Sequence, residues 1–190
     1  MLHPSGLAIP FSVASAPERL PDFEIHFRPT PGAADAQAMQ DLIARARLLH
    51  LEGPFGDVFV RGPTVSPLCL IAGGTGISQC LSIVGHLCAC RQTERVRLLW
   101  SVSASAHLYA IEVLDGIRAH HGWFEPIAAV DEPDGQVGAI AALTRHGVPT
   151  EGEVILAGSP PFVYAVCDAL DALGGYAGRL RSDVFAYAPR

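Results

Sequence analysis

A glycine-rich turn in the first half of the chain has the residue types of a phosphate-binding loop. It follows the apolar run Leu68–Ala72 and consists of Gly73, Gly74, Thr75 and Gly76. Glycine lacks a Cβ atom, so the backbone N–H groups of such a turn can approach an anion closely. A helix predicted to begin near Ile77 would direct the positive end of its dipole at the same place. We therefore predict nucleotide binding at this turn, with a tight strand-to-helix connection as the alternative.

The elements that must position this turn alternate along the chain. The pattern predicts strands at 68–72, 96–102, 124–130, 153–157 and 184–187, and helices at 76–91, 107–120, 138–146 and 161–173. Parallel strands joined by helices form an open sheet that binds its ligand at the carboxyl ends of the strands. We therefore predict an α/β fold with a doubly wound parallel sheet. A second turn of Gly158, Ser159 and Pro160 would lie at the same edge of that sheet.

The first 65 residues follow a different pattern. Alternating apolar residues predict antiparallel strands at 11–15 and 23–28, followed by a helix at 36–47. So few strands cannot close a small barrel, so we expect a partial antiparallel β-barrel whose edges must be covered. Because Pro63 and Pro67 mark a boundary, the predicted domains are residues 1–65 and residues 66–190.

The composition excludes several other classes of function. The chain has 190 residues and a net charge of −6, and all thirteen of its basic residues are scattered arginines. Since a nucleic acid requires a basic face, we expect no nucleic-acid partner. The five cysteines contain no CxxC pair and the eight histidines show no metal-ligand spacing, so we expect reduced cysteines and no metal site. Without a secretory signal or an apolar run of about 18 residues, we expect a cytoplasmic chain with no membrane span.

Six motifs occur in an order that is typical of one family. They are Pro10–Ser15, Gly53–Gly56, Gly73–Gly76, Trp100–Ser103 with His107–Tyr109, Ala157–Pro161 and Asp183–Tyr187. In this order they resemble the ferredoxin reductase superfamily, most closely the bacterial NAD(P)H:flavin reductases and the reductase components of oxygenases. The resemblance implies a barrel that binds FAD or FMN, followed by a nicotinamide-binding domain. Hydride would pass from NAD(P)H to flavin N5 between the two.

The resemblance implies a role for each matching residue on the flavin side. The motif of Pro10, Phe11, Ser12 and Val13 would bind the flavin, with Phe11 against the isoalloxazine ring. The Ser12 hydroxyl would lie near N5 and steady the charge that accompanies hydride arrival, which makes it a candidate catalytic residue. The aromatic residues Phe185 and Tyr187 would cover the flavin side until nicotinamide displaces them.

The nicotinamide side is implied by three further motifs. The cofactor would contact Gly73, Gly74, Thr75, Gly76 and Ile77, then Ser101 and Ser103, and then Gly158, Ser159 and Pro160. Thr75 would lie beside the nicotinamide and is the second candidate catalytic residue. Relatives often carry an Arg at the position of Ser103, where it can pair with a 2′-phosphate. The serine therefore favours NADH, with NADPH as the alternative. Many relatives also have a Cys at the position of Ala157.

Two departures from the family pattern lower the expected affinity for flavin. Ile9 stands where relatives usually have an Arg that pairs with the flavin phosphate, and losing such a contact costs about 1.5–3 kcal/mol. Only nine residues precede Pro10, so the first barrel strands are missing from the sequence. We therefore expect a dissociable flavin. The chain is part of a longer protein, a short form completed by a homodimer or a partner chain, or a relative that has lost tight flavin binding.

The leading hypothesis is an NAD(P)H-dependent oxidoreductase of the flavin reductase type, which holds the two cofactors in place while they carry out the chemistry. The alternative is a non-catalytic nucleotide-binding or regulatory subunit. A third hypothesis is an electron-transfer reductase that serves an iron–sulfur partner, since the chain has no cluster spacing of its own.

Overall fold

The central part of the molecule is a parallel sheet. The computed structural model describes residues 10–29, 34–90, 93–131, 137–147 and 151–190. Five parallel strands pair in the order β3-β2-β1-β4-β5. Their bounds are β1 (Leu68–Gly73), β2 (Val96–Val102), β3 (Phe124–Val130), β4 (Glu153–Ala157) and β5 (Arg179–Arg181). The predicted doubly wound α/β fold is therefore confirmed.

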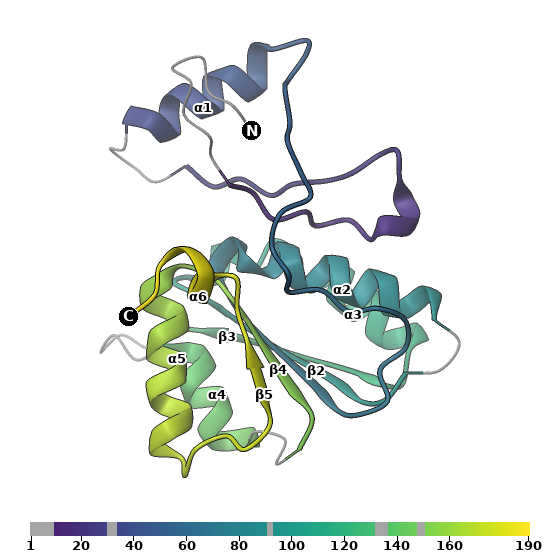
Figure 1. Ribbon diagram of the computed structural model, residues 1–190, viewed down its shortest axis with the longest axis vertical. Coiled ribbons are helices and arrows are strands. Elements are labelled where there is room, and N and C mark those ends of the chain that lie inside the picture. Colours follow the sequence, from purple (N-terminus) through teal and green to yellow (C-terminus); the bar gives the residue numbers. More distant parts are fainter. Residues whose placement is uncertain (1–9, 30–33, 91–92, 132–136, 148–150) are drawn as a thin grey trace.

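Two pairs of helices cover the two faces of this sheet (Figure 1). Helices α2 (Ile77–Ala89) and α3 (Ile111–His120) pack on one face, and α4 (Gly138–His146) and α5 (Pro160–Ala172) pack on the other. The alternation of side chains along β1 supplies both cores. Leu68, Leu70 and Ala72 belong to the first core, whereas Cys69 and Ile71 belong to the second. A strand buried on both faces requires the continuous apolar run seen in the sequence.

The C-terminal end differs from the prediction. The strand predicted at 184–187 is wrong, because these residues form the short helix α6 (Val184–Tyr187). The fifth strand is instead β5, which carries two arginines in three residues and so has no apolar run to reveal it. Val184 is buried in the second core, and this tertiary contact outweighs the strand preference of the segment.

The segment before β1 contains helix α1 (Ala34–Arg45) and lies beside the α/β layers in Figure 1. The strands predicted at 11–15 and 23–28 are wrong as strands, because the described residues retain one antiparallel bridge between Val13 and Ile25. The N–H group of Glu24 donates to the Ser15 hydroxyl at 2.9 Å and not to a backbone carbonyl. This side-chain acceptor interrupts the ladder after one bridge. The partial barrel stays a prediction.

Several hydrogen bonds attach this segment to helix α2. The Ser82 hydroxyl donates to the Ser15 carbonyl at 2.8 Å, and His86 contacts Glu18 at 2.5 Å. Gly85 faces Ala16 so closely that an added Cβ atom would lie 3.0 Å from the alanine methyl group. The segment therefore packs along the helix that follows the glycine turn.

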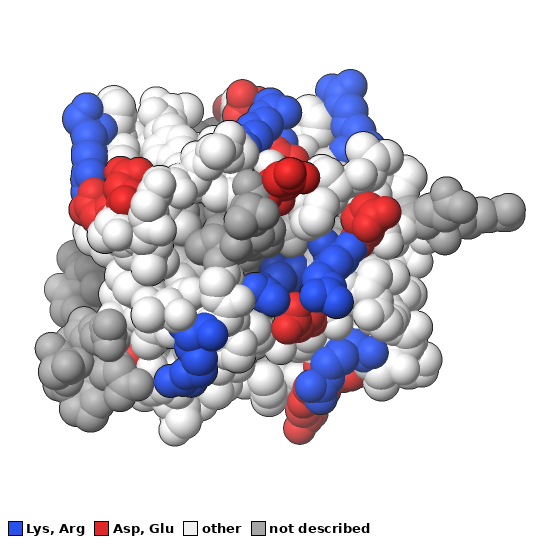
Figure 2. Space-filling view, turned by 90° about the horizontal axis from the view of Figure 1, so that it is seen from below, with Lys and Arg blue, Asp and Glu red and all other residues white. Residues whose placement is uncertain are grey.

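The face at the amino ends of the strands carries mixed charges. Figure 2 shows basic and acidic side chains next to one another on this face. Ion pairs join neighbouring strands near these ends, Arg97 with Glu125 at 3.0 Å and Arg181 with Glu153 at 2.9 Å. Among the described helices, none is both long and apolar enough to cross a lipid bilayer.

Candidate functional site

Parallel strands bring the candidate site together at their carboxyl ends. The glycine turn follows β1, Ser103 follows β2, Gly158 follows β4 and Asp183 follows β5. Because all five strands run the same way, these positions share one edge of the sheet. The structure thus places the predicted nicotinamide-side residues at one edge, although they are up to 87 positions apart in the sequence, from Gly73 to Pro160.

The three glycines of the turn are required for different reasons. A Cβ atom on Gly73 would lie 2.6 Å from the Phe162 ring, and one on Gly76 would lie 2.3 Å from the Ala157 carbonyl oxygen. Gly74 has a φ of +54°, and nothing approaches its Cβ position within 4 Å. Gly73 therefore lets the turn pack against Phe162 of α5 and Gly76 lets it pack against the end of β4, whereas Gly74 leaves open space beside the backbone. A dinucleotide phosphate fits such a turn because it can be reached by backbone N–H groups.

Strand β2 steadies the glycine turn. Trp100 is fully buried, and its indole N–H group donates to the Gly74 carbonyl at 2.9 Å. The ring of Tyr109 meets the Trp100 ring edge-on, with 5.5 Å between centroids. Partial burial raises the pKa of Tyr109 to about 12, and a hydrogen bond with Ser78 opposes this rise. Tyr109 therefore stays neutral at physiological pH.

The two serines predicted near the adenosine ribose have different environments. Ser101 is 1% exposed, and its hydroxyl donates to Asp131 at 2.7 Å and accepts from the Ala139 N–H group at 3.1 Å. It therefore fixes the start of α4 to the sheet. Ser103 is exposed, and its hydroxyl lies 3.1 Å from His107. Of the two, Ser103 has the hydroxyl that a ligand can reach.

Residues 70–168 match the family described as the oxidoreductase NAD-binding domain. The chain belongs to this family. The matched residues include the glycine turn, the end of β2 and the second turn, so the NAD-binding domain contains the site described above.

Relatives of this NAD-binding domain are reductases. The chain is 28% identical to the reductase component 1 of a Comamonas terephthalate 1,2-dioxygenase, over 94% of this chain and 55% of the relative. It is 33% identical to an NAD(P)H-flavin reductase of Vibrio harveyi, over 69% of this chain and 59% of the relative. The chain spans about half the length of the curated relatives it matches.

Solved structures show the same fold. The cytochrome P450 reductase GcoB of Amycolatopsis superposes with a TM-score of 0.76 and 23% identity, covering 96% of this chain and 58% of that chain. The ferredoxin-NADP+ reductase of Plasmodium falciparum superposes with a TM-score of 0.67 and 13% identity, covering 90% of this chain and 76% of that chain. The fold around the NAD-binding domain is therefore ferredoxin-reductase-like.

The predicted flavin-side residues lie on the segment that precedes the NAD-binding domain. Phe11 is half-buried and meets Phe27 edge-on, with 5.8 Å between ring centroids. Its neighbours Pro10, Ser12 and Val13 are exposed. The structure therefore presents this motif at the surface, while Ile9 lies outside the described residues.

The predicted C-terminal residues pack beside α5. Phe185 lies against Tyr164 with 6.1 Å between centroids, and the Tyr164 hydroxyl donates to the Ala188 carbonyl at 2.6 Å. Tyr187 is 61% exposed. In the second turn, Ser159 precedes the first residue of α5 and is exposed, next to Pro160. These aromatic and polar groups lie close to the start of the helix that the glycine turn contacts.

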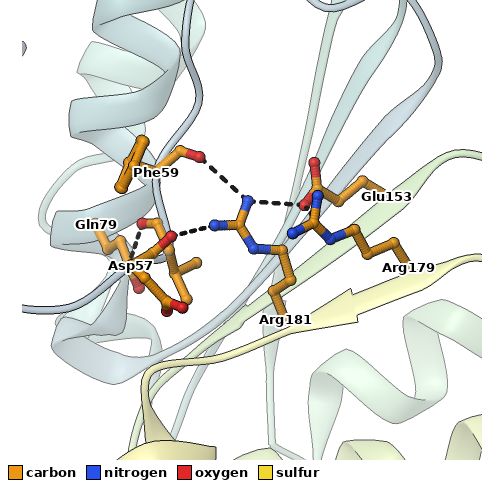
Figure 3. A network of polar contacts seen from close by, with 7 residues as sticks. Asp57, Phe59, Gln79, Glu153, Arg179 and Arg181 are labelled. Carbon is orange, nitrogen blue, oxygen red and sulfur yellow. Dashed lines mark hydrogen bonds and ion pairs between the residues drawn. The ribbon is translucent and has the colours of Figure 1, made fainter.

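A polar network ties the linker before β1 to the NAD-binding domain (Figure 3). The Arg181 guanidinium donates to the Phe59 carbonyl at 3.1 Å, to the Asp57 carbonyl, and to Glu153 at 2.9 Å. Gln79 donates to the Val58 carbonyl at 3.1 Å. The network therefore fixes the linker against both β5 and α2.

Gln79 also reaches the C-terminal motif. Its side chain donates to Asp183 at 2.9 Å. A Cβ atom on Gly56 would lie 2.8 Å from the Asp183 carboxylate, and the φ of Gly56 is +84°. Glycine is therefore required at this turn, where the Gly53–Gly56 motif meets the Asp183–Tyr187 motif.

The buried thiols are unsuited to catalysis. Burial raises the pKa of both Cys69 and Cys80 to about 12, so both stay protonated. Within the described ranges, no group of three or more His, Cys, Asp or Glu side chains is placed to hold a metal ion.

Sequence reasoning missed several residues that hold the parts of the molecule together around the site. Asp131 and Gln79 fix loops at this edge, Arg181 fixes the linker to β5, and Arg28 lies beside His107. Arg28 and His107 are 79 positions apart. No local pattern links residues so distant in the sequence, so only the tertiary fold could reveal their contact.

Proposed function

We propose that this chain forms the nicotinamide-binding part of an NAD(P)H-dependent oxidoreductase that passes hydride to a flavin. The observation that carries the proposal is the glycine turn. No atom lies within 4 Å of the Cβ position of Gly74, so a ligand can approach the backbone there. Gly73 and Gly76 let the turn pack against Phe162 and Ala157. The names of the relatives, reductase components and flavin reductases, point to the same class of reaction.

On the nicotinamide side, the proposal gives each element a task. The backbone of Gly73–Gly76 and Ile77 would hold the pyrophosphate and the nicotinamide end, with the Thr75 hydroxyl beside the ring. The turn of Gly158, Ser159 and Pro160 would border the same pocket. Nicotinamide and flavin supply the hydride chemistry when they are bound, and the protein contributes position and the exclusion of water.

On the flavin side, we propose that Phe11 lies against the isoalloxazine ring and that Ser12 lies near N5. Pro10 and Val13 would shape the same surface, and Phe185 and Tyr187 would border it from the C-terminal segment. Support comes from exposure, because Pro10, Ser12 and Val13 all present surface that a ligand can reach. A flavin held by this motif alone would be a dissociable FMN or FAD.

We also propose that residues 1–65 and 66–190 act as two functional units, and that a second copy or a partner chain completes the flavin-binding surface. Large apolar side chains support this, because Leu48, Phe55 and Val65 are 89%, 82% and 91% exposed. Exposed apolar groups of this size are typical of surfaces that bind another protein. Size-exclusion chromatography with light scattering would test it, since a monomer at all concentrations contradicts a homodimer.

The cysteines support a proposal about where the chain works. All five are free in the structure, and none forms a disulfide. Since free thiols persist in reducing compartments, we propose that the chain works in the cytoplasm.

Oxidation of NADH and NADPH by the purified chain tests the main proposal. FMN, FAD or riboflavin is added, and the background from free flavin is subtracted. Gly74→Ala places a Cβ atom on a residue with a φ of +54°, and a side chain in this left-handed region costs about 1–2 kcal/mol. We therefore expect its turnover to fall about five- to thirtyfold. Gly116→Ala is the matched control. Nothing approaches its Cβ position within 4 Å either, but Gly116 lies in helix α3 and has no positive φ.

A non-catalytic nucleotide-binding subunit is the second candidate. The single bridge between Val13 and Ile25 favours it, because so little sheet gives a flavin little support. Isothermal titration with NADH and NADPH separates the two candidates. Nucleotide binding that is indifferent to FMN, without turnover, would favour the subunit, and tighter binding in the presence of FMN would favour the reductase.

A further inference from the structure

A cluster of three side chains lies where the second strand ends. The guanidinium of Arg28, from the N-terminal segment, donates to His107 Nε2 at 3.1 Å. The other ring nitrogen of His107 lies 3.1 Å from the Ser103 hydroxyl. The cluster therefore brings a permanent positive charge to the loop after β2, where the sequence itself has no basic residue at position 103.

The chemistry of the cluster fixes its hydrogen bonds. Arginine is only a donor, so His107 Nε2 must accept and the ring proton must be on Nδ1. Nδ1 then donates to the Ser103 oxygen, which leaves the Ser103 hydroxyl proton to point outward. Arg28 and Ser103 are both exposed. The cluster therefore presents N–H and O–H donors together at the surface, which suits an anion with several oxygen atoms.

The surroundings favour an anion as well. In the part of the chain that the structure describes, none of the ion pairs includes Arg28. The acidic residue at the end of the next strand, Asp131, accepts from Ser101 at 2.7 Å and from the Gly138 N–H group at 3.0 Å. Its carboxylate therefore binds the start of α4 and does not add a negative charge to the Ser103 loop.

We infer that Arg28, positioned by His107, binds the 2′-phosphate of NADPH together with Ser103. In parallel nucleotide-binding folds, the end of the second strand lies beside the adenosine ribose, where an acidic residue selects NADH and an arginine accommodates a 2′-phosphate. Here the arginine comes from outside the NAD-binding domain. This inference rests on the proposed function, and it gives NADPH a contact that the serine at position 103 could not provide alone.

Binding of two small probes to the full chain tests the inference. Isothermal titration compares adenosine 2′,5′-bisphosphate with 5′-AMP, which differ only in the 2′-phosphate. We expect the bisphosphate to bind about tenfold or more tightly, as a charge-assisted contact provides. Arg28→Gln should remove this preference and leave 5′-AMP binding within about twofold, while Arg28→Lys should keep part of it because the charge remains without the planar fork.

Two further variants control for charge and position. Arg118→Gln removes one positive charge from the exposed part of α3, where Arg118 pairs with Asp115 at 3.0 Å, and should leave both affinities unchanged. His107→Ala removes the ring that holds Arg28 and should lower the preference for the bisphosphate without changing 5′-AMP binding. The KM for NADPH should rise in this variant, so the ratio of KM for NADH to KM for NADPH should fall.

Three outcomes would overturn the inference. Equal binding of the two probes would show that no 2′-phosphate contact exists. An equal loss of affinity for both probes in Arg28→Gln would show that Arg28 binds the 5′-phosphate. If folded wild-type chain binds neither these probes nor NADH, the proposed function fails as well, whereas NADH binding without a 2′-phosphate preference overturns this inference alone.

Discussion

The α/β region and the segment that precedes it bury their apolar residues very differently. In the α/β region every strand from β1 to β4 contributes side chains that are almost fully buried. Before residue 66, the buried apolar residues of the described chain are Ala14, Met39 and Val58. The same segment exposes Val13, Leu20, Phe23, Leu48, Leu51, Phe55, Phe59 and Val65.

This difference indicates where the stability of the chain lies. The sheet, with a helix pair on each face, provides its own core, so the nucleotide-binding edge is built on rigid elements. The preceding segment depends on contacts to α2, to the Ser103 loop and to Arg181. Its geometry is therefore set by a few polar contacts, and those contacts control how the proposed flavin side meets the nicotinamide side.

A pair of leucines gives the largest test of this difference. Leu70 is fully buried in the central strand, so Leu70→Ala should lower the free energy of unfolding by about 2–5 kcal/mol. Leu48 is 89% exposed, and Leu48→Ala should change it by less than about 0.5 kcal/mol. Urea unfolding followed by circular dichroism measures both. Similar losses at the two sites would mean that the N-terminal segment has a core of its own.

Two serines at the end of β2 allow a finer test. Ser101→Ala removes a buried hydroxyl that joins Asp131 to α4, so we expect a loss of about 1–3 kcal/mol. Ser103→Ala changes an exposed hydroxyl and should cost less than about 0.5 kcal/mol. If the exposed serine proves as costly as the buried one, the loop after β2 is more rigid than its contacts indicate.

The sequence predicted the sheet well because burial on both faces leaves a strong pattern. The run at Leu68–Ala72 followed by the glycine turn gave β1 and the start of α2 within one or two residues. The end of α4 at His146 was also predicted correctly. The next residue, Gly147, has a φ of +72°, which glycine adopts readily, so it ends the helix. Such signals are local, so they can be found without the tertiary fold.

The rest could not be predicted because it depends on contacts between distant residues. Strand β5 has no apolar pattern and exists through its pairing with β4. The 11–15 and 23–28 segments have strand-like sequences, yet Ser15 diverts one of the N–H groups that a ladder would need. At the site, the roles of Ser101 and Ser103 look alike in the sequence, and only burial distinguishes them.

A pair of arginines tests the attachment of the linker. Arg181 is 16% exposed and donates to two linker carbonyls, so Arg181→Gln should cost about 1–2 kcal/mol and should speed amide exchange around Asp57–Phe59. Arg179 is 72% exposed and lies 3.9 Å from the same Glu153 carboxylate. Arg179→Gln should therefore leave exchange in the linker unchanged. Unchanged exchange in both variants would show that other contacts hold the linker.

The smallest effect is expected where η1 (Pro17–Arg19) meets α2. The hydrogen bond from His86 lowers the pKa of Glu18, so this contact stabilises the folded state above the ordinary glutamate pKa of about 4.3. The contribution is lost as the pH falls through the lower folded value. Glu18→Gln should therefore lower the urea midpoint slightly at pH 7, and its difference from the wild type should shrink as the pH falls through the lower folded pKa.

Glu112→Gln is the control for this pH dependence, since Glu112 is exposed on α3 and takes part in none of the ion pairs among the described residues. Its urea midpoint should follow the wild type throughout the same pH series. A difference between Glu18→Gln and the wild type that stays constant as the pH falls would mean that the glutamate acts through packing and not through its charge. In that case the contact between the N-terminal segment and α2 would belong to the packed core, and the two regions would differ less than their exposure indicates.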